Sequence, residues 1–167
     1  LSPSKPSRAK AKAGVSPFGR VIDTGSGKVR VRSAVKAALV AAVDVIADNP
    51  SVAAGIMGAV QAEPSCQIVR NLAERAAQNP DARILRAPTS YPHPDYPQAR
   101  TMTPLIVALP AGNAALYAEE HFGPIMFIIA ATDRNAAVEE ATRLAREHGA
   151  ISSYLYSNDD AFIDNAI

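Results

Sequence analysis

Two short apolar segments, residues 103–109 and 125–131, constrain the fold of this chain more than any other feature. Each is a nearly continuous run of apolar side chains, and runs of this length are typical of strands that are covered on both faces. Helix-like stretches lie between them and after them. The pattern predicts an α/β fold with an open, largely parallel sheet, helices on both faces, and these two strands at its centre.

Capping residues and helical periodicity predict three helices before these strands. Ser33 can cap a helix that ends near Asp48. Its buried face would hold Val35, Leu39, Val43 and Ile46. A short helix at residues 51–60 and a longer one ending near Asn79 come next, and a strand at residues 83–86 follows them.

The pattern of helix and strand continues after the second apolar segment. Thr132 or Asp133 can cap a helix that Gly149 ends. The inner face of this helix would hold Val138, Ala141, Leu144 and Ala145, and Glu139 lies four residues before Arg143, a spacing that suits an ion pair. A strand at residues 151–156 and a last helix capped by Asn158 or Asp159 complete the prediction.

The single cysteine, Cys66, must be considered as a nucleophile. It recurs at helical spacing with Val69, Leu72, Ala73 and Ala76, so it belongs to the apolar stripe of a helix. We interpret it as a buried structural thiol and assign no catalytic residue in this chain. The three histidines, at positions 93, 121 and 148, have no metal-ligand spacing, so no metal site is predicted.

The motif Glu-Glu-His-Phe-Gly-Pro at residues 119–124 has the chemistry of a nucleotide-binding loop. The carboxylate of Glu120 offers two acceptor oxygens, which suit the paired hydroxyls of a ribose. The ring of Phe122 can pack against the face of a nicotinamide, while Gly123 lets the backbone approach a ligand and Pro124 fixes the entry into the next strand. The same residue types also form ordinary solvated turns, so the flanking sequence has to decide.

Three segments resemble the second half of the catalytic domain of the aldehyde dehydrogenase superfamily in order and spacing. They are Thr-Pro-Leu-Ile-Val at residues 103–107, Glu-His-Phe-Gly-Pro at 120–124, and Arg-Leu-Ala-Arg-Glu-His-Gly-Ala at 143–150. The segment Tyr-Pro-His-Pro-Asp-Tyr-Pro at 91–97 is similar to one in the phenylacetic-acid degradation type of this superfamily. The resemblance implies aldehyde oxidation in aromatic catabolism, with NAD or NADP as cofactor.

By this resemblance, Glu120 matches the glutamate that binds the nicotinamide ribose, and Phe122 matches the aromatic residue that lines the nicotinamide pocket. The similarity covers residues 29–167, as part of a catalytic domain. In the family, a cysteine thiolate attacks the aldehyde with help from a glutamate base, and both lie upstream of the matched region. The chain is therefore expected to be a fragment that is inactive alone and that associates with itself or with a companion polypeptide.

A noncatalytic interaction protein, which uses the same α/β sheet to bind a partner, is the alternative reading. The net charge of +1 gives no electrostatic reason to expect nucleic acid or a membrane surface as partner. The single cysteine suits a reducing compartment such as the cytoplasm. Residues 1–28 have a basic start and no acidic residue before Asp23; we interpret them as a flexible leader or remnant rather than a transit sequence or a nucleic-acid arm.

The glycine-rich part of this leader does not indicate a phosphate-binding loop. Gly25, Ser26, Gly27 and Lys28 lack Walker spacing, because position 22 holds Ile22 where such a loop needs glycine. Residues 19–22 and 28–31 are instead predicted to form two short strands about a turn.

Overall fold

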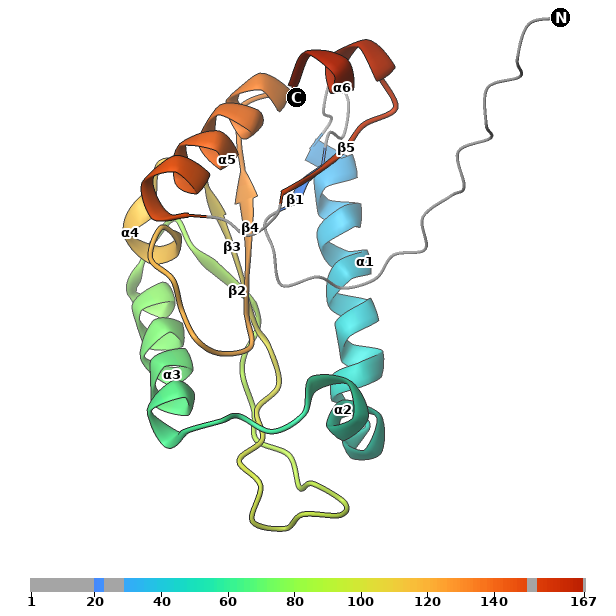
Figure 1. The fold of residues 1–167 in the computed structure, drawn as a ribbon, viewed down its shortest axis with the longest axis vertical. Coiled ribbons are helices and arrows are strands. Elements are labelled where there is room, and N and C mark those ends of the chain that lie inside the picture. Colours follow the sequence, from blue (N-terminus) through green and yellow to red (C-terminus); the bar gives the residue numbers. More distant parts are fainter. Residues whose placement is uncertain (1–19, 23–28, 150–152, 167) are drawn as a thin grey trace, which may run out of the picture.

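The computed structural model describes residues 20–22, 29–149 and 153–166. Three consecutive helices and two strands come first, and strands and helices alternate from residue 105 onward (Figure 1). The elements are β1 (Arg20–Ile22), α1 (Val29–Ala47), α2 (Pro50–Met57), α3 (Glu63–Gln78), β2 (Arg83–Arg86), β3 (Leu105–Pro110), α4 (Ala114–Tyr117), β4 (Ile125–Ala130), α5 (Arg134–His148), β5 (Tyr154–Tyr156) and α6 (Asp160–Ala166).

The two apolar segments form neighbouring parallel strands. β3 and β4 pair from Leu105 opposite Ile125 to Pro110 opposite Ala130. β2 adds to the other side of β3 in antiparallel orientation, with an irregularity between Ile84 and Arg86, so the sheet order is β2-β3-β4. β1 and β5 form a separate parallel pair. The predicted α/β class and the parallel pairing of the two apolar strands are confirmed.

The two apolar strands are not equally buried. β3 has a neighbour on each side, and its residues from Leu105 to Leu109 are buried. β4 lies at one end of the three-stranded order, and all of its residues are half-buried. The expectation that both strands are central is therefore correct for β3 and wrong for β4. Hydrophobicity indicates that a segment is a strand, but it does not give its position in the sheet.

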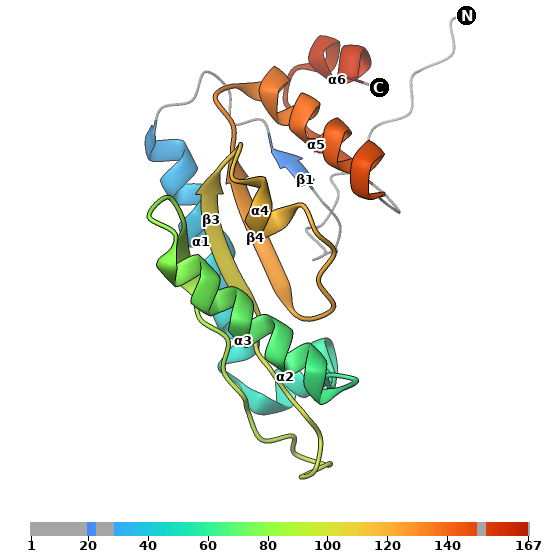
Figure 2. The ribbon, with the colours of Figure 1, turned by 90° about the vertical axis from the view of Figure 1, so that its left-hand side faces the viewer.

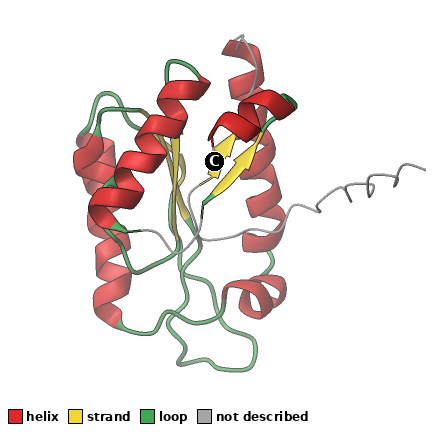
Figure 3. Cartoon of the chain, turned by 45° about the horizontal axis from the view of Figure 1, so that its top comes forward, coloured by secondary structure: helices red, strands yellow, loops and turns green. Residues whose placement is uncertain are grey.

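Helices cover both faces of the three-stranded sheet. The side chains of a strand point alternately to opposite faces, so β3 contributes residues to a core on each face. On one face, the α3 residues Cys66, Val69, Leu72 and Ala76 form a core with Leu105, Val107 and Leu109 of β3. On the other face, Val43 and Ala47 of α1 pack with Ile106. Figure 2 shows α3 and α4 in front of the sheet and α1 behind it, and Figure 3 shows the strands between helices on two sides.

Helix α1 differs from the prediction at its start. It begins at Val29 rather than after Ser33, so the strand predicted at residues 28–31 is wrong. β1 lies within the predicted first strand, but it pairs in parallel with β5 instead of forming a hairpin. The β-branched residues Val29 and Val31 suggested a strand, and this weak preference is overridden when a helix extends through them. The leader at 1–19 and the glycine-rich segment at 23–28 lie outside the described residues.

Side-chain caps begin the later helices, as their sequences predict. Oδ1 of Asp133 accepts hydrogen bonds from the backbone N–H groups of Asn135 (2.9 Å) and Ala136 (3.0 Å) at the start of α5. These bonds, that of Ala136 above all, lower the pKa of the Asp133 carboxyl. Asp159 accepts from the N–H of Phe162 at 3.0 Å at the start of α6. Capping chemistry is local, so the sequence alone locates these helix starts well.

Other boundaries shift by a few residues. α2 is capped by Asn49, whose Oδ1 lies 3.1 Å from the backbone nitrogen of Ser51, and it ends at Met57 rather than near residue 60. β5 covers only residues 154–156 of the predicted strand, and residues 150–152 lie outside the described part.

Within the described residues, no single helix is long and apolar enough to cross a membrane. Residues Ala34–Ala47 of α1 and Pro50–Met57 of α2 reach that length and apolar character only when they are taken together, and a bend of 103° separates them.

Candidate functional site

The loop of residues 118–124, which joins α4 to β4, carries both predicted cofactor-binding residues. Glu120 is exposed, and the side chain of Phe122 is 67% exposed. A carboxylate and an aromatic ring are thus presented to solvent two residues apart, on a segment that enters the strand β4. In the rest of this article, this segment is called the Glu120 loop.

Three other residues of the Glu120 loop, His121, Gly123 and Pro124, pack against the body of the protein. Nε2 of His121 lies 3.2 Å from the carbonyl oxygen of Leu116, and its ring lies 6.1 Å from the ring of Phe127. A Cβ atom placed on Gly123 would lie 2.6 Å from Cγ2 of Val69, so the backbone there rests directly on α3. The carbonyl of Pro124 accepts a hydrogen bond from the N–H of Leu105 at 2.9 Å. The exposed residues Glu120 and Phe122 therefore belong to a loop that is anchored to the protein at His121, Gly123 and Pro124.

A buried tyrosine stands immediately before the loop. Tyr117 ends α4, and its hydroxyl accepts a hydrogen bond from the N–H of Gly112 at 3.1 Å and donates one to Oε1 of Glu140 at 2.6 Å. Arg143 donates to both carboxylate oxygens of Glu140, at 2.8 Å and 3.0 Å, and also to Glu147. These contacts connect α4 to the end of β3 and to α5.

The charges of this network are consistent with its hydrogen bonds. The hydrogen bonds from Arg143 and then from Tyr117 lower the pKa of the Glu140 carboxyl, because both favour the ionised acceptor. Burial raises the pKa of the Tyr117 hydroxyl, and its bond to Glu140 raises it further. The tyrosine is therefore a neutral donor and the glutamate an ionised acceptor at neutral pH.

The sequence missed this network, and it paired Arg143 with the wrong residue. Glu139 is exposed, and the arginine binds Glu140 at i−3 and Glu147 at i+4 instead. The spacing of Glu140, Arg143 and Glu147 is a local signal that sequence reasoning could have used. The contact with Tyr117 crosses 23 residues, so no local pattern predicts it.

Cys66, His93 and His148 lie on other elements than the Glu120 loop, which contains His121. Cys66 is 2% exposed in the core beneath α3, and its predicted burial is confirmed. His93 lies in the loop between β2 and β3, where its Nδ1 accepts from the N–H groups of Asp95 and Tyr96, each at 3.2 Å. His148 ends α5, 3.9 Å from a carboxylate oxygen of Glu147. Across the described residues, no three His, Cys, Asp or Glu side chains are grouped to hold a metal ion.

Known proteins similar to this chain point to one family. A family model described as "Aldehyde dehydrogenase family" matches residues 28–166. Among solved structures, an NAD-dependent aldehyde dehydrogenase from Burkholderia multivorans is similar, with 30% sequence identity and a TM-score of 0.70. The match covers 79% of this chain and 23% of that one, so the chain spans less than a quarter of the length of its relative. No curated protein matches the chain.

Proposed function

Because this chain belongs to the aldehyde dehydrogenase family, we propose that its Glu120 loop forms part of the nicotinamide-binding wall of an NAD- or NADP-dependent aldehyde dehydrogenase. The observation that carries this proposal is the exposed pair of Glu120 and Phe122 on a loop that is anchored through His121, Gly123 and Pro124. The solved relative is described as NAD-dependent. When bound, the cofactor supplies the hydride acceptor for aldehyde oxidation.

The residues of the loop suit the two parts of a nicotinamide riboside. The carboxylate of Glu120 accepts hydrogen bonds from the ribose hydroxyls, and charge assistance makes such bonds strong. The ring of Phe122 packs against one face of the nicotinamide and removes apolar surface of both groups from water. Since the backbone is already held by His121 and Gly123, little conformational entropy remains to be lost when the cofactor binds.

We further propose that the aldehyde is a product of aromatic catabolism, as in the phenylacetic-acid degradation type of the family. The support is the sequence of residues 91–97, which lies in the long loop between β2 and β3. A ring-derived semialdehyde, held as a coenzyme A thioester, is the substrate class that fits this resemblance. The single cysteine suits a reducing compartment, and we propose the cytoplasm.

Turnover by this chain alone is not expected. Aldehyde oxidation in the family uses a cysteine thiolate, and the one cysteine here is buried among the apolar residues of α3 and β3. An aldehyde that reaches the Glu120 loop does not meet that thiol. We therefore propose that the nucleophile and the base are supplied by other polypeptide segments when the aldehyde is oxidised.

Binding of NADH to the full chain tests the proposed wall. The variants Glu120→Gln and Phe122→Ala are each expected to weaken binding about tenfold, which corresponds to ~1.4 kcal/mol. Glu119→Gln and Tyr96→Ala are matched controls, because Glu119 is the neighbouring exposed glutamate and Tyr96 has the same 67% exposure as Phe122. If the wild-type chain fails to bind NADH, or if the controls weaken binding as much as the loop variants, the proposal is wrong.

A second candidate function, a noncatalytic interaction protein, is favoured by the outer face of α1. Among residues 34–47 of this helix, the exposed positions repeat every three or four residues and carry small or apolar side chains: Ala34, Ala37, Ala38, Ala41, Ala42 and Val45. Val45 is 76% exposed, and Ile56 of α2 adds another exposed apolar side chain. Alanines let two helices approach closely, so we propose that two copies of the chain pair through this outer face about a two-fold axis.

Sedimentation velocity over a range of concentrations tests this pairing. The wild-type chain is expected to shift toward a dimer as concentration rises, and Val45→Glu with Ile56→Glu is expected to abolish the shift. Tyr96→Glu, at an exposed aromatic residue in the β2–β3 loop, serves as control. A monomer at all concentrations contradicts self-association, and it would leave a companion polypeptide as the occupant to test.

A further inference from the structure

We propose that Tyr117, Glu140 and Arg143 are positioning residues that hold the Glu120 loop in the geometry needed to bind a nicotinamide nucleotide. The inference rests on the proposed function of that loop and adds three residues that lie outside it, on α4 and α5. They act through the start of the loop, which follows Tyr117 directly in the chain.

Tyr117 joins three elements at one atom. Its hydroxyl oxygen lies 3.1 Å from the backbone nitrogen of Gly112, just after β3, and 2.6 Å from Oε1 of Glu140 on α5. Its ring is buried, with its centroid 6.3 Å from that of Phe127 on β4. The four-residue helix α4 is too short to hold its own orientation by internal hydrogen bonds. The direction in which the chain leaves α4 therefore depends on contacts with other elements: this hydroxyl, the hydrogen bond from Arg75 to the carbonyl oxygen of Ala115 at 2.7 Å, and the buried side chain of Leu116. Of these, the hydroxyl contact is the one made by the residue that directly precedes the loop.

Arg143 fixes the acceptor of that hydrogen bond. Its Nε and Nη2 atoms donate to the two oxygens of Glu140, at 3.0 Å and 2.8 Å, which is a bidentate contact. The Glu140 side chain is 17% exposed, whereas that of Glu147, the other partner of Arg143, is 52% exposed. A bidentate guanidinium keeps the carboxylate ionised and prevents it from rotating away from the tyrosine. Glu140 is thus the fixed point to which α4 is attached.

The other end of the loop is fixed by contacts outside α4. Gly123 rests on Val69 of α3, and the carbonyl of Pro124 accepts a hydrogen bond from the N–H of Leu105, whereas His121 contacts the carbonyl of Leu116 in α4 itself. The segment is thus held at its start by Tyr117 and at its end by Gly123 and Pro124. Releasing the first of these points would remove the anchor nearest to the loop and shift Glu120 relative to Phe122. A binding site loses affinity when its first-contact residues are no longer held in place.

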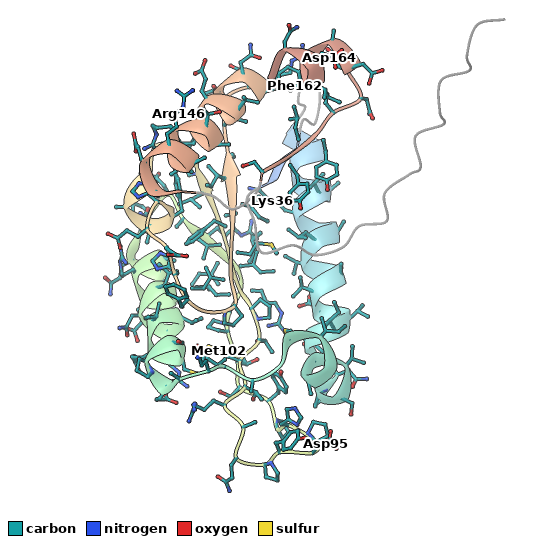
Figure 4. All side chains as sticks on the ribbon, viewed as in Figure 1. Lys36, Asp95, Met102, Arg146, Phe162 and Asp164 are labelled. Atoms are coloured by element: carbon teal, nitrogen blue, oxygen red, sulfur yellow. The ribbon has the colours of Figure 1, made fainter. Side chains whose placement is uncertain are left out.

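A second buried tyrosine provides a matched control. Tyr91 has the same 8% exposure as Tyr117, and its hydroxyl donates a hydrogen bond to the carbonyl oxygen of Gly58 at 3.1 Å. It lies in the loop between β2 and β3, whose tip at Asp95 is at the opposite end of the molecule from Arg146 of α5 (Figure 4). Its hydroxyl contacts Gly58, after α2, and not the Glu120 loop, so removing it perturbs a comparable buried contact at another place in the fold.

The chain has no tryptophan, so Phe122→Trp places a single fluorescent reporter in the loop. In this background, Tyr117→Phe and Glu140→Gln are expected to lower the fluorescence anisotropy of the reporter and to increase its quenching by acrylamide. In the wild-type background, the same two substitutions are expected to weaken NADH binding about tenfold. Tyr91→Phe is expected to change neither measurement, although it lowers the midpoint of thermal unfolding as Tyr117→Phe does.

The ligand-free fluorescence measurement separates the two proposals. If neither Tyr117→Phe nor Glu140→Gln alters the reporter, or if Tyr91→Phe alters it equally, the positioning role is overturned whether or not the chain binds NADH. If both variants alter the reporter but the wild-type chain does not bind NADH, the positioning of the loop is supported and the proposed cofactor function is wrong. Should Tyr117→Phe unfold, Glu140→Gln decides the question, because that residue is on the partly exposed side of the contact.

Discussion

At the scale of single residues, the most constrained position in the Glu120 loop is Gly123. A methyl group there would lie 2.6 Å from Cγ2 of Val69, and Val69 is fully buried in the core. Gly123→Ala therefore forces the loop and α3 apart. We expect the free energy of unfolding to fall by about 1–3 kcal/mol, as in other overpacked sites. Urea unfolding followed by circular dichroism measures this change.

Gly55→Ala is the matched control for this substitution. Gly55 lies inside α2, and no atom lies within 4 Å of a Cβ placed on it. Because alanine favours a helix interior over glycine, this variant is expected to raise the free energy of unfolding by about 0.5–1 kcal/mol. If the two variants shift stability in the same direction, the contact between Gly123 and Val69 does not explain the effect.

The sequence predicted residues whose roles depend on near neighbours and missed those that depend on distant ones. The burial of Cys66 and the caps at Asp133 and Asp159 follow from periodicity and local hydrogen bonding, and the structure confirms them. Gly123 was expected to admit a ligand, yet its close neighbour is α3. Tyr117 had no predicted role, because its partner Glu140 lies on a different helix. Whether Glu120 and Phe122 bind a cofactor remains a prediction.

At the scale of elements, Arg86 joins β2 to α1 across one face of the sheet. Its Nε lies 2.8 Å from Asp44 and its Nη2 lies 3.0 Å from Asp48, and its side chain is 10% exposed. Arg86→Ala removes both contacts and leaves a gap between strand and helix, so we expect the free energy of unfolding to fall by about 1–3 kcal/mol. Arg83→Ala, at the exposed other end of the same strand, is expected to have little effect. Equal losses in the two variants would contradict a specific role for Arg86.

The cap of α5 gives this helix a pH dependence. The pKa of Asp133 is below its ordinary value of 3.8, because the N–H groups of Ala136 and Asn135 favour the ionised carboxylate. Stability from this cap is therefore present above pH 3.8 and is lost as the pH falls through the lowered pKa. Asparagine also caps helices but does not titrate. We expect Asp133→Asn to match the wild type in its urea midpoint at neutral pH and to exceed it near pH 3; a constant difference at both pH values would exclude this contribution.

The elements also show where sequence patterns stop being informative. The strand identity of β3 and β4 was predicted because apolar runs of that length are distinctive, whereas the half-buried state of β4 depends on which strands lie beside it. The start of α1 was misplaced because Val29 and Val31 are common in strands. The sequence predicted a buried face of α1 that includes Val43, which is buried, but the run of exposed small and apolar side chains on its outer face was not singled out.

At the scale of the whole molecule, Cys66 reports the integrity of the core. Its thiol is 2% exposed and lies among residues of α3, β3 and α4, so a reagent reaches it only when these elements separate. With a typical free energy of unfolding of at least about 5 kcal/mol, labelling by a disulfide reagent in native buffer should be at least ~10³-fold slower than in urea. The rate should rise with urea in parallel with the loss of helical circular dichroism. Fast labelling of the native chain would mean that the thiol is accessible; Cys66 would then have to be tested as the nucleophile, by comparing aldehyde-dependent NAD reduction in the wild type and in Cys66→Ala.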